Sequence, residues 1–439
     1  MLVTRRRRRF TPTANPNPSV PCRACNPLHR ATAQPEHRMR RETPASHPFA
    51  KREKTAPASS CSNGETHGLL PACDTIPANY AAIPTETKTV NPFGWAIIGP
   101  GPIAHKFADA VTYIDGATLV RVQGRNLTRA SAFADQWCRD SAAHGHIHRP
   151  GCTNARASDH IDAVLNDPAV DAVYIATPHA FHAEAIRRCL QAGKPVLCEK
   201  PLVADAVTAA GLIALSRQRK VFLMEAVWTR FLPIYAKVRQ WLQSNSIGAI
   251  RSMQSSFCFN APFDPASRLF DPAQAGGALL DIGIYNLTVT RWVMQAALGH
   301  CPAAMQIHAT GVIGPTGVDH RMAATIVFPE GVTSQFVCSL DSSGDDAFHI
   351  FGEHGTITIH RHFWGGTAAT LAQAGVAPVT VERPWRINGF EGEIEEAMRC
   401  IAAGKIESDV MPHEETRTTL EWMDQIRRVV GVRYPFEVG

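Results

Sequence analysis

The strongest constraint on the fold is a glycine turn at residues 95–110, where an apolar run passes into an amphipathic segment. Gly99 and Gly101 supply the turn, Ala104 is the third small residue of the pattern Gly-x-Gly-x-x-Ala, and Ile103 stands before it. In a strand-turn-helix unit, the first glycine permits the tight turn and the second lets the backbone approach a pyrophosphate. The stretch therefore predicts the first βαβ unit of a dinucleotide-binding fold, although an ordinary strand-to-helix turn would share this pattern.

The segments after the turn alternate between strand and helix patterns. A proline at the first helical position, here Pro102, suits a turn whose N–H groups have no partner inside the helix. We expect strands at residues 117–122, 170–176 and 195–198 and helices at residues 128–137, 160–165 and 183–192. Alternation of this kind is typical of an α/β fold with a parallel sheet, and of a Rossmann domain at residues 91–225.

The end of the second expected strand bears on the choice of cofactor. Dinucleotide folds use an acidic residue at this position to select NAD, and a basic residue accommodates the 2′-phosphate of NADP. Here the sequence is Gln123-Gly124-Arg125-Asn126, without a carboxylate. Arg125 therefore favours NADP, with NAD still possible if the arginine is only a solvated loop residue.

Composition places the chain among ordinary globular proteins. Its 439 residues give room for two or three domains, with 45% hydrophobic and 19% charged residues, and no apolar run approaches the length of a membrane span. The net charge of +5 is unevenly distributed, because residues 1–90 hold 14 Lys and Arg against 6 Asp and Glu, a charge of +8. The remaining residues have a net charge of −3, which argues against nucleic acid as a partner.

Residues 1–90 form a segment of different character. Five consecutive arginines, Arg5 to Arg9, are followed by frequent Pro, Ser, Thr and Ala with little hydrophobic periodicity, so we expect a disordered basic tail. A twin-arginine export signal would need an apolar stretch that residues 11–25 do not offer. An organelle transit peptide, a basic tail for nucleic acid or anionic membrane, and a true start further downstream remain open.

The cysteines do not predict a metal site or a disulfide framework. The tail carries Cys22-x-x-Cys25 with His29, but Cys61 and Cys73 lie too far away and do not form a second close pair. The other eight cysteines are scattered, which suggests buried thiols in a reducing compartment and hence the cytoplasm. We expect no metal.

Histidines occur in two settings. His144, His146 and His148 lie in an expected loop at residues 138–158 and look like surface side chains. By contrast, Thr177-Pro178-His179 and His182 directly follow a buried strand, and ligands of open α/β sheets bind beyond the carboxyl ends of the strands. We expect His179 and His182 to face the cleft, although they could instead serve only to begin the next helix.

The motifs together resemble a known family. The glycine turn, the Ala-Thr-Pro-His strand end and the run Cys198-Glu199-Lys200-Pro201-Leu202 resemble the glucose-fructose oxidoreductase/inositol dehydrogenase (Gfo/Idh/MocA) family, from about Phe93 to Glu437. The resemblance implies that Thr177, Pro178, His179, His182 and Glu199 lie at the cofactor. It also implies that Lys200 holds cofactor and substrate and supports proton transfer.

Further stretches place the resemblance more closely, in the branch that contains dimeric dihydrodiol dehydrogenase and NADP-dependent D-xylose 1-dehydrogenase. These stretches are residues 224–231, 268–272 and 276–285. Asp281, Gly283 and Tyr285 form a helix-borne Asp-x-Gly-x-Tyr signature, and a spacing of four puts Asp281 and Tyr285 on one helical face. Asn286 stands where the branch has proline, a departure that could move the start of the helix.

The resemblance also indicates the catalytic chemistry. Oxidation of a secondary alcohol needs a hydride acceptor and a base at the hydroxyl, and the ammonium of Lys200 would favour the phenolate of Tyr285. Tyr285 could otherwise be a core tyrosine, and Asp281 only a helix cap. Trp228, Arg251 and Phe257 match positions that line the substrate pocket in this branch.

Beyond residue 289 the pattern changes to alternating strands. We expect strands at residues 307–312, 321–328, 332–339, 348–352 and 355–360, and helices at residues 391–402 and 414–430. This predicts an α+β substrate-binding and dimerisation domain at residues 226–439, with a large and mostly antiparallel sheet. In the resembled family the open face of this sheet packs against a second subunit, which implies a homodimer.

Two functions remain open at this point. The first is an NADP-dependent dehydrogenase of a ring secondary alcohol in a sugar, polyol or trans-dihydrodiol, with no nucleic acid or membrane partner. The second is a non-catalytic NADP-binding regulator of the same fold. Lys200, Asp281 and Tyr285 are all present, which favours catalysis.

Overall fold

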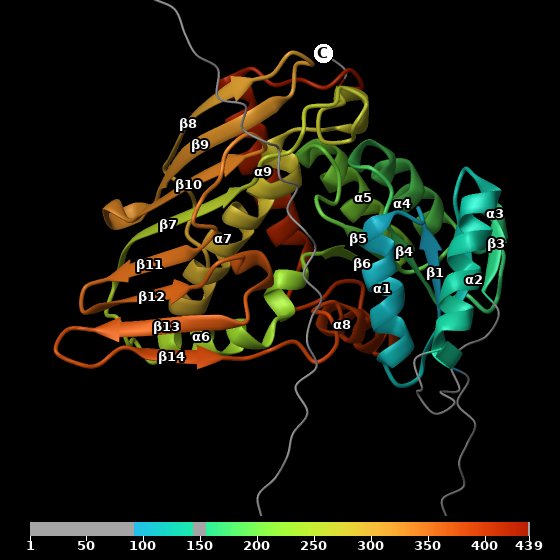
Figure 1. Cartoon of the computed structure of the whole chain (residues 1–439), viewed down its shortest axis with the longest axis horizontal. Helices are drawn as coiled ribbons and strands as arrows, with labels where there is room; N and C mark the ends of the chain where they lie inside the picture. Colours follow the sequence, from blue (N-terminus) through green and yellow to red (C-terminus); the bar gives the residue numbers. More distant parts are fainter. Residues whose placement is uncertain (1–91, 144–154, 438–439) are drawn as a thin grey trace, which may run out of the picture. The chain divides into compact units, whose positions relative to one another are not determined.

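A computed structural model describes residues 92–143 and 155–437 (Figure 1). Its first sheet has six parallel strands in the order β3-β2-β1-β4-β5-β6. The order 3-2-1-4-5-6 is that of the doubly wound dinucleotide fold, so the expected α/β class is confirmed. The strands are β1 (Phe93–Ile98), β2 (Ala117–Gln123), β3 (Arg156–Ser158), β4 (Ala172–Ile175), β5 (Val196–Glu199) and β6 (Leu223–Ala226).

Helices connect these strands and cover the sheet. α1 (Pro102–Tyr113) begins at the expected proline and buries Phe107 and Val111 on its apolar face. α5 (Ala206–Arg219) begins at Asp205, whose side chain accepts a hydrogen bond from the N–H of Thr208, a regular N-cap. The other helices of this part are α2 (Leu127–Ala143), α3 (Asp162–Leu165) and α4 (His182–Gln191).

The expected loop at residues 138–158 is wrong at both ends. α2 continues to Ala143, and β3 pairs in parallel with β2 through Arg156, Ala157 and Ser158. A three-residue edge strand of polar and small residues has no alternating pattern, so the sequence carries no signal for it. The three loop histidines and the tail of residues 1–90 lie outside the described residues.

The second sheet has eight strands in the order β14-β13-β12-β11-β7-β10-β9-β8. Every neighbouring pair is antiparallel except β10 with β7, which confirms a mostly antiparallel sheet. The strands are β7 (Ile250–Cys258), β8 (Gln306–Ile313), β9 (Asp319–Val327), β10 (Thr333–Ser339), β11 (Phe348–Gly352), β12 (Gly355–Ile359), β13 (Ala368–Gln373) and β14 (Val379–Glu382).

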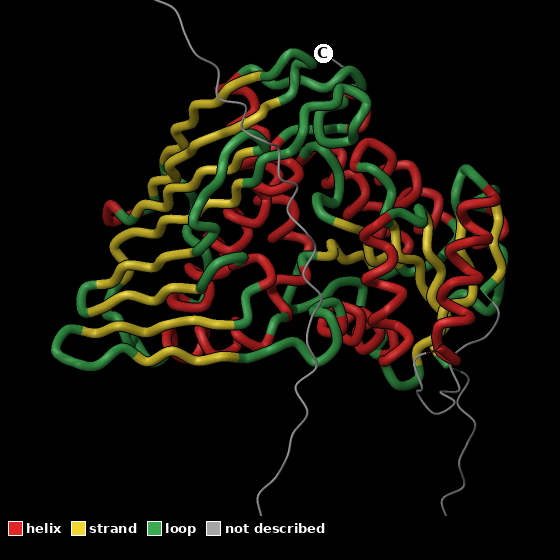
Figure 2. The backbone as a smooth tube through the Cα atoms, in the orientation of Figure 1, coloured by secondary structure: helices red, strands yellow, loops and turns green. Residues whose placement is uncertain are grey.

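One face of the second sheet is covered and the other is open. α6 (Pro233–Gln243) and α7 (Ile284–Leu298) pack against it, with α6 on β13 and α7 on β7 and β10. Buried and more exposed side chains alternate along β9 and β10, as expected when helices cover a single face. In the tube view of Figure 2 the strands lie side by side, with the helices on one side of them.

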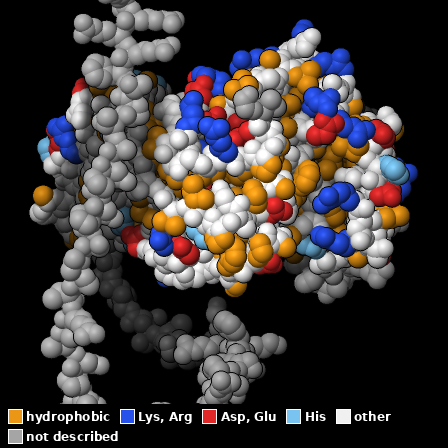
Figure 3. Space-filling view, turned by 90° about the horizontal axis from the view of Figure 1, so that it is seen from above, with side chains coloured by type: hydrophobic (Ala, Val, Ile, Leu, Met, Phe, Trp, Pro, Cys, Tyr) orange, Lys and Arg blue, Asp and Glu red, His pale blue; other side chains and the backbone are white. Residues whose placement is uncertain are grey.

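The last two helices return to the first sheet. α9 (His413–Val430) packs on α5, β6 and β8, and α8 (Glu391–Ala402) packs on α1. On the face seen in Figure 3, Lys and Arg side chains are interspersed with Asp and Glu side chains. Among the helices of the described part, none has the length and apolar character to cross a membrane.

Candidate active site

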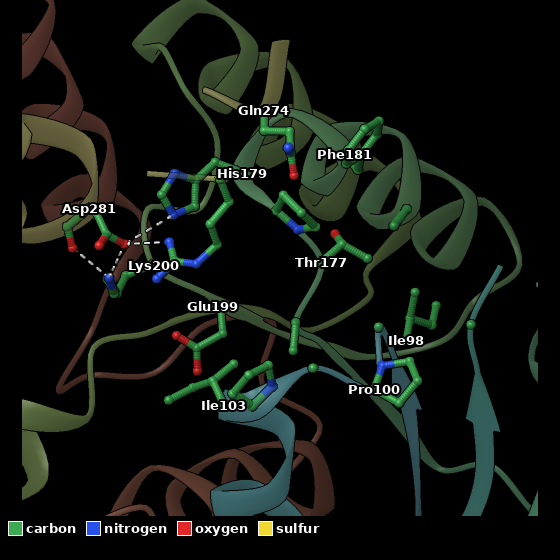
Figure 4. Close-up of a pocket in the computed structure, with 18 of the residues that line it drawn as sticks. Ile98, Pro100, Ile103, Thr177, His179, Phe181, Glu199, Lys200, Gln274 and Asp281 are labelled. Carbon is green, nitrogen blue, oxygen red and sulfur yellow. Dashed lines mark hydrogen bonds and ion pairs between the residues drawn. The ribbon is translucent and has the colours of Figure 1, made fainter. Parts of the chain in front are cut away.

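A cleft of about 1280 Å³ lies beyond the carboxyl ends of β1, β4 and β5 (Figure 4). Its walls come from the glycine turn and strand ends of the first sheet, and from the segments around β7 and α7 of the second. This is the place where an open parallel sheet binds its ligand. The volume exceeds the roughly 300–1,000 Å³ of a common small-molecule pocket, as expected for a dinucleotide together with a substrate.

The glycine turn is shaped for close approach of a ligand to the backbone. Gly99 has φ +91°, and a Cβ placed on it would lie 2.8 Å from the carbonyl carbon of Ala176 and the nitrogen of Thr177. A Cβ on Gly101 would find its nearest atom at 4.0 Å, so this glycine borders open space in the cleft. The first glycine is therefore required by the turn, and the second leaves room for a ligand.

The cleft also fits the polar groups of a dinucleotide. Ile103, Thr177, Pro178 and His179 line it, while Ala104 is on the buried face of α1. The hydroxyl of Thr177 is buried and finds no hydrogen-bond partner among the described residues. Because a buried hydroxyl without a partner is costly, this atom is suited to pair with a bound group.

Two guanidinium groups lie at the end of β2. Arg125 lines the cleft, with its guanidinium carbon 5.3 Å from the ring centroid of Phe181, and Arg129 lines it one turn further along. Asn126 lines the cleft too, but its side chain accepts a hydrogen bond of 2.9 Å from the N–H of Arg129 and so begins α2. The basic character of this end depends on the two arginines.

At the opposite end, three polar side chains gather around Asp281 (Figure 4). Lys200 Nζ donates to the Asp281 carbonyl oxygen at 2.6 Å and lies 3.4 Å from Oδ1, and Arg268 donates to the same Oδ1 at 2.8 Å. His179 Nε2 lies 3.8 Å from Oδ1. Burial would raise the pKa of Asp281, but Lys200, Arg268 and His179 outweigh it and hold that pKa below its ordinary value, so Asp281 is a carboxylate.

Tyr285 stands one turn after Asp281. Its hydroxyl oxygen accepts a hydrogen bond of 3.0 Å from the indole N–H of Trp228, and Lys200 Nζ lies 5.1 Å from the centroid of its ring. Burial and the nearby carboxyl group of Glu199 raise the pKa of Tyr285 well above its ordinary value. The expected lowering of this pKa is therefore wrong, because the net shift is upward and the ammonium of Lys200 is directed at Asp281. Tyr285 is a protonated phenol.

Glu199 lines the back of the cleft and is buried. One oxygen of its carboxyl group accepts a short hydrogen bond from the hydroxyl of Tyr174, and burial raises its pKa. Glu393 at the start of α8 is fully buried, and its pKa is raised by burial and by Glu199. Both groups therefore favour the protonated form more than ordinary carboxyl groups do.

Of the two histidines expected at the cleft, His179 lies there and His182 does not. His179 lines the cleft and donates through Nδ1 to the carbonyl of Ala275 at 3.0 Å, and burial lowers its pKa to about 3, so its ring is neutral and weakly basic. His182 is fully buried and does not line the cleft. Its ring nitrogens face the carbonyl oxygens of Thr177 at 2.7 Å and Pro201 at 3.0 Å, so it ties two loops together behind the site.

Aromatic side chains form the remaining wall. Trp228 and Phe257 line the cleft as expected, and they are joined by Phe259, Trp364 and Phe390. The rings of Phe257 and Trp364 are stacked, with their centroids 3.3 Å apart and an angle of 4° between their planes. The substrate end of the cleft is thus mainly aromatic, with Lys200 and Tyr285 at its edge.

Arg251 does not lie at the cleft. It is the extra residue of a bulge in β7, because Ile250 pairs with Gly352 and Ser252 pairs with Phe351. Its side chain is half-exposed and forms an ion pair with Glu353. Six residues of extended strand, about 20 Å, separate it from Phe257.

Several cleft residues have no clear signal in the sequence. Arg268 stands in a motif that marks the branch, but its pairing with Asp281 depends on how the loop before α7 folds back. Trp364 and Phe390 come from segments more than a hundred residues after Phe257, and Lys106 of α1 lies with its Nζ 5.5 Å from the centroid of the Trp228 ring. Among these residues, only Arg268 could have been noticed in the sequence, because it stands in the stretch 268–272 that marks the branch.

Within residues 92–143 and 155–437, no group of His, Cys, Asp and Glu has the arrangement to hold a metal ion.

The fold and the cleft define a dinucleotide-binding protein with an acid–base site on its substrate side. Residues 93–227 match the oxidoreductase family with an NAD-binding Rossmann fold, and residues 235–358 match the Gfo/Idh/MocA C-terminal domain. The chain belongs to the Gfo/Idh/MocA family of oxidoreductases, as the resemblance of its motifs implied.

Individual relatives agree with this placement. The chain is 30% identical over 348 residues to trans-1,2-dihydrobenzene-1,2-diol dehydrogenase of Mus musculus, covering 78% of this chain and 98% of the relative. It is 31% identical over 347 residues to the enzyme of the same name from Danio rerio, with 77% and 97% coverage.

Solved structures support the fold. A 3-ketoreductase from Actinomadura kijaniata, in complex with NADP and TDP-benzene, aligns with a TM-score of 0.66 at 24% identity. An aldose-aldose oxidoreductase from Caulobacter crescentus aligns with a TM-score of 0.66 at 22% identity. Each alignment covers 77% of this chain and 98% of the other.

Proposed function

We propose that this protein is an NADP-dependent dehydrogenase that acts on a ring secondary alcohol, with a trans-dihydrodiol as the preferred class of substrate. The observation that carries the proposal is the Lys200, Asp281 and Tyr285 cluster at the edge of an aromatic pocket. Stacked Phe257 and Trp364 suit a flat, largely apolar carbocycle better than a ring with a hydroxyl on every carbon. The names of the curated relatives point to the same substrate class.

Tyr285 and Lys200 have separate roles in the proposed reaction. When bound, the nicotinamide supplies or accepts the hydride. The hydroxyl oxygen of Tyr285 already accepts from Trp228, so its own proton is available to an oxygen of the substrate. Lys200 is fixed by Asp281 beside that phenol, where its positive charge favours an alkoxide in the transition state.

The protonation of Tyr285 bears on the direction of the reaction. A phenol with a raised pKa stays protonated at neutral pH and can give its proton to a forming alkoxide, which is far more basic, and this suits reduction of a carbonyl. In the direction of oxidation the same group must first lose its proton, so that direction is favoured by alkaline pH. His179 is held too weakly basic to replace it.

Arg125 and Arg129 support a preference for NADP over NAD. They lie at the end of β2, where the 2′-phosphate of the adenosine ribose is expected, and guanidinium groups pair with phosphate through charge-assisted hydrogen bonds. The cofactor of the proposed reaction is therefore NADP(H), with NAD(H) as the weaker alternative.

The test is reduction of NADP by the purified protein with a panel of substrates. The panel contains trans-1,2-dihydrobenzene-1,2-diol, D-xylose and myo-inositol, and the Tyr285→Phe variant serves as the control for each. We expect the highest kcat/KM for the diol, with D-xylose second. Turnover of none of the three, in a protein that binds NADP, would support the non-catalytic regulator instead.

We also propose a homodimer formed through the open face of the second sheet, and a location in the cytoplasm. The open face supports the dimer because β10 presents Val337, an aliphatic side chain that is 41% exposed, in the middle of the sheet. Cys189, Cys198, Cys258, Cys301, Cys338 and Cys400 are free thiols, which suits a reducing compartment.

A further inference from the structure

Two side chains from distant parts of the chain hold the start of the catalytic helix. Asp319, the first residue of β9, accepts a hydrogen bond of 2.7 Å from the N–H of Leu279 through Oδ2. Tyr434, near the end of the chain, donates to the carbonyl of Gly276 at 2.7 Å. Gly277 has φ +117°, and a Cβ on it would lie 2.3 Å from Asp319 Oδ1, so this carboxyl group rests directly on the backbone.

The segment that Asp319 and Tyr434 bind, residues 276–279, leads directly to the catalytic groups. Residues Leu279–Gly283 form a single π-helical turn, and α7 follows with Tyr285 in its first turn. Asp281 lies two residues after Leu279, and its carbonyl oxygen is the 2.6 Å acceptor of Lys200. A short path therefore joins Asp319 to the ammonium group through the N–H of Leu279 and the backbone of Asp281. π-Turns inside helices often occur at functional sites, where the ladder of hydrogen bonds is locally interrupted.

We propose that Asp319 is a positioning residue whose ionised carboxylate, through the N–H of Leu279, holds Asp281 against Lys200, and that loss of this charge loosens the contact. The catalytic readout of this proposal rests on the proposed function, whereas the structural readout below does not. A negative charge at a helix start also interacts favourably with the helix dipole, so the charged form is the better cap.

The surroundings of Asp319 make its charge sensitive to pH near neutrality. The residue is fully buried, and burial raises its pKa to about 7 although the N–H of Leu279 acts in the opposite direction. The other titratable or charged groups that face it are Cys338 of β10, Tyr434 of the last segment and Arg427 of α9. Arg427 is already paired with Asp424 at 2.6 Å and with Glu437 at 2.5 Å, so it neutralises Asp319 only weakly.

Ionisation of this group works against stability. A carboxyl group with a raised pKa in the folded state contributes stability that is complete below its unfolded pKa and is lost as pH rises towards the folded value. In this case the loss falls between about pH 4 and about pH 7. Oδ1 also has no hydrogen-bond partner among the described residues. Asp319 costs stability when it is ionised, yet a short backbone path connects it to Lys200. Its presence is therefore better explained by function than by packing.

The first experiment measures hydrogen exchange in residues 276–285, at pH values about one unit below and above the pKa of Asp319 and corrected for the intrinsic rate. In the wild type we expect protection of the Leu279 amide to fall by about tenfold from the higher to the lower pH, the change that one unit on either side of a titration allows. Asp319→Asn keeps an acceptor but has no titrating charge, so its protection should not change with pH. Tyr434→Phe removes the other hold and should lower protection at both pH values equally.

The second experiment measures the pH profile of kcat for trans-1,2-dihydrobenzene-1,2-diol with NADP. We expect kcat of the wild type and of Tyr434→Phe to fall as the pH is lowered through about 7, because Asp319 loses its charge there. Asp319→Asn should lack this fall, and KM for NADP should be unchanged in all three proteins. A wild type that does not oxidise the diol contradicts the proposed function, while hydrogen exchange still decides the role of Asp319. The proposal is overturned if Asp319→Asn keeps the pH response of Leu279, or if it keeps the limb in kcat.

Discussion

Tyr285 is the residue on which the chemistry depends, because its protonation state follows from its burial and its neighbours. Trp228 binds its oxygen, Glu199 and Asp281 lie close enough to disfavour a phenolate, and Lys200 is engaged elsewhere. The tyrosine is therefore an acid in the structure. For Tyr285 to act as a base in oxidation, its phenol must first lose its proton, so oxidation depends on alkaline pH.

Replacement of this tyrosine gives the first prediction. Tyr285→Phe should lower kcat for diol oxidation by about 10² or more, the usual contribution of a positioned acid or base, and leave NADP affinity nearly unchanged. Wild-type oxidation should also keep rising above neutral pH, because deprotonation of a phenol with a raised pKa requires alkaline conditions. Tyr235→Phe is the matched control, since Tyr235 is buried and bonded to the Phe363 carbonyl away from the cleft. Near-normal turnover by Tyr285→Phe would remove the assigned role.

Arg125 gives the second prediction, which concerns the cofactor. Arg125→Ala should weaken NADP binding by about 10- to 100-fold, the value of one or two charge-assisted hydrogen bonds, and leave NAD binding unchanged. Titration of protein fluorescence with each nucleotide measures both constants. Arg399→Ala, which removes an exposed guanidinium paired with Glu396 on α8 outside the cleft, should change neither. Equal losses for NADP and NAD in Arg125→Ala would contradict the assignment.

At the scale of elements, a buried ion cluster ties the C-terminal helix to the site. Glu415 of α9 accepts from Arg230 at 2.6 Å and from Arg291 of α7 at 2.5 Å, and all three side chains are buried. Arg230 lies in the short helix Trp228–Phe231, two residues after the cleft residue Trp228. The cluster therefore fixes the relative positions of α7, α9 and the wall that carries Trp228.

Removal of the charge of Glu415 gives the third prediction. Glu415→Gln leaves two buried guanidinium groups without a counter-ion and should lower the free energy of unfolding by about 3–5 kcal/mol. Glu414→Gln, on the exposed side of the same helix and paired with Arg417 and Thr418, should cost about 1 kcal/mol or less. Urea unfolding of both variants measures the difference.

The same cluster has a definite pH dependence. Burial would raise the pKa of Glu415, but Arg230 and Arg291 outweigh it and lower that pKa. A lowered pKa contributes stability that is present above the unfolded value, about 4.3, and is lost as pH falls through the folded value. Loss of wild-type stability below about pH 4 should therefore be smaller in Glu415→Gln, and an identical acid response in both proteins would contradict this account.

At the scale of the whole molecule, the two sheets and the helices that cover them are complete from β1 onward. Deletion of residues 1–90 should therefore leave the melting temperature and kcat/KM unchanged within error. Differential scanning calorimetry and the NADP reduction assay measure the two quantities. Failure of the shortened protein to fold would show that the tail contributes to the structure.

The proposed dimer gives the last prediction. Val337→Glu places a charge on the open face of the second sheet and should shift the mass measured by light scattering from two chains to one. Val207→Glu, at a valine on α5 that is 82% exposed, is the control and should leave the mass unchanged. A wild type that is monomeric at high protein concentration would contradict the dimer at once.

The parts of this protein that the sequence determined by itself are those with local physical causes. Gly99 is required because any side chain would collide with the neighbouring strand end, and such a requirement can be recognised from a few residues. The helices α8 and α9 and most strands of both sheets follow from periodicity, which is also local. The family motif around Lys200 and the Asp281 to Tyr285 spacing belong to the same group.

What only the tertiary structure decided depends on neighbours that are distant in sequence. Arg268 and Trp364 reach the cleft through loops whose course no periodicity predicts. Arg251 lies in a bulge whose partner strand is about a hundred residues further along the chain. His182 points away from the cleft because it is bonded to backbone carbonyls behind it. The raised pKa of Tyr285 belongs to this group as well. It is set by burial and by carboxyl groups on other elements, because the energy of a charge in a protein depends on everything that surrounds it.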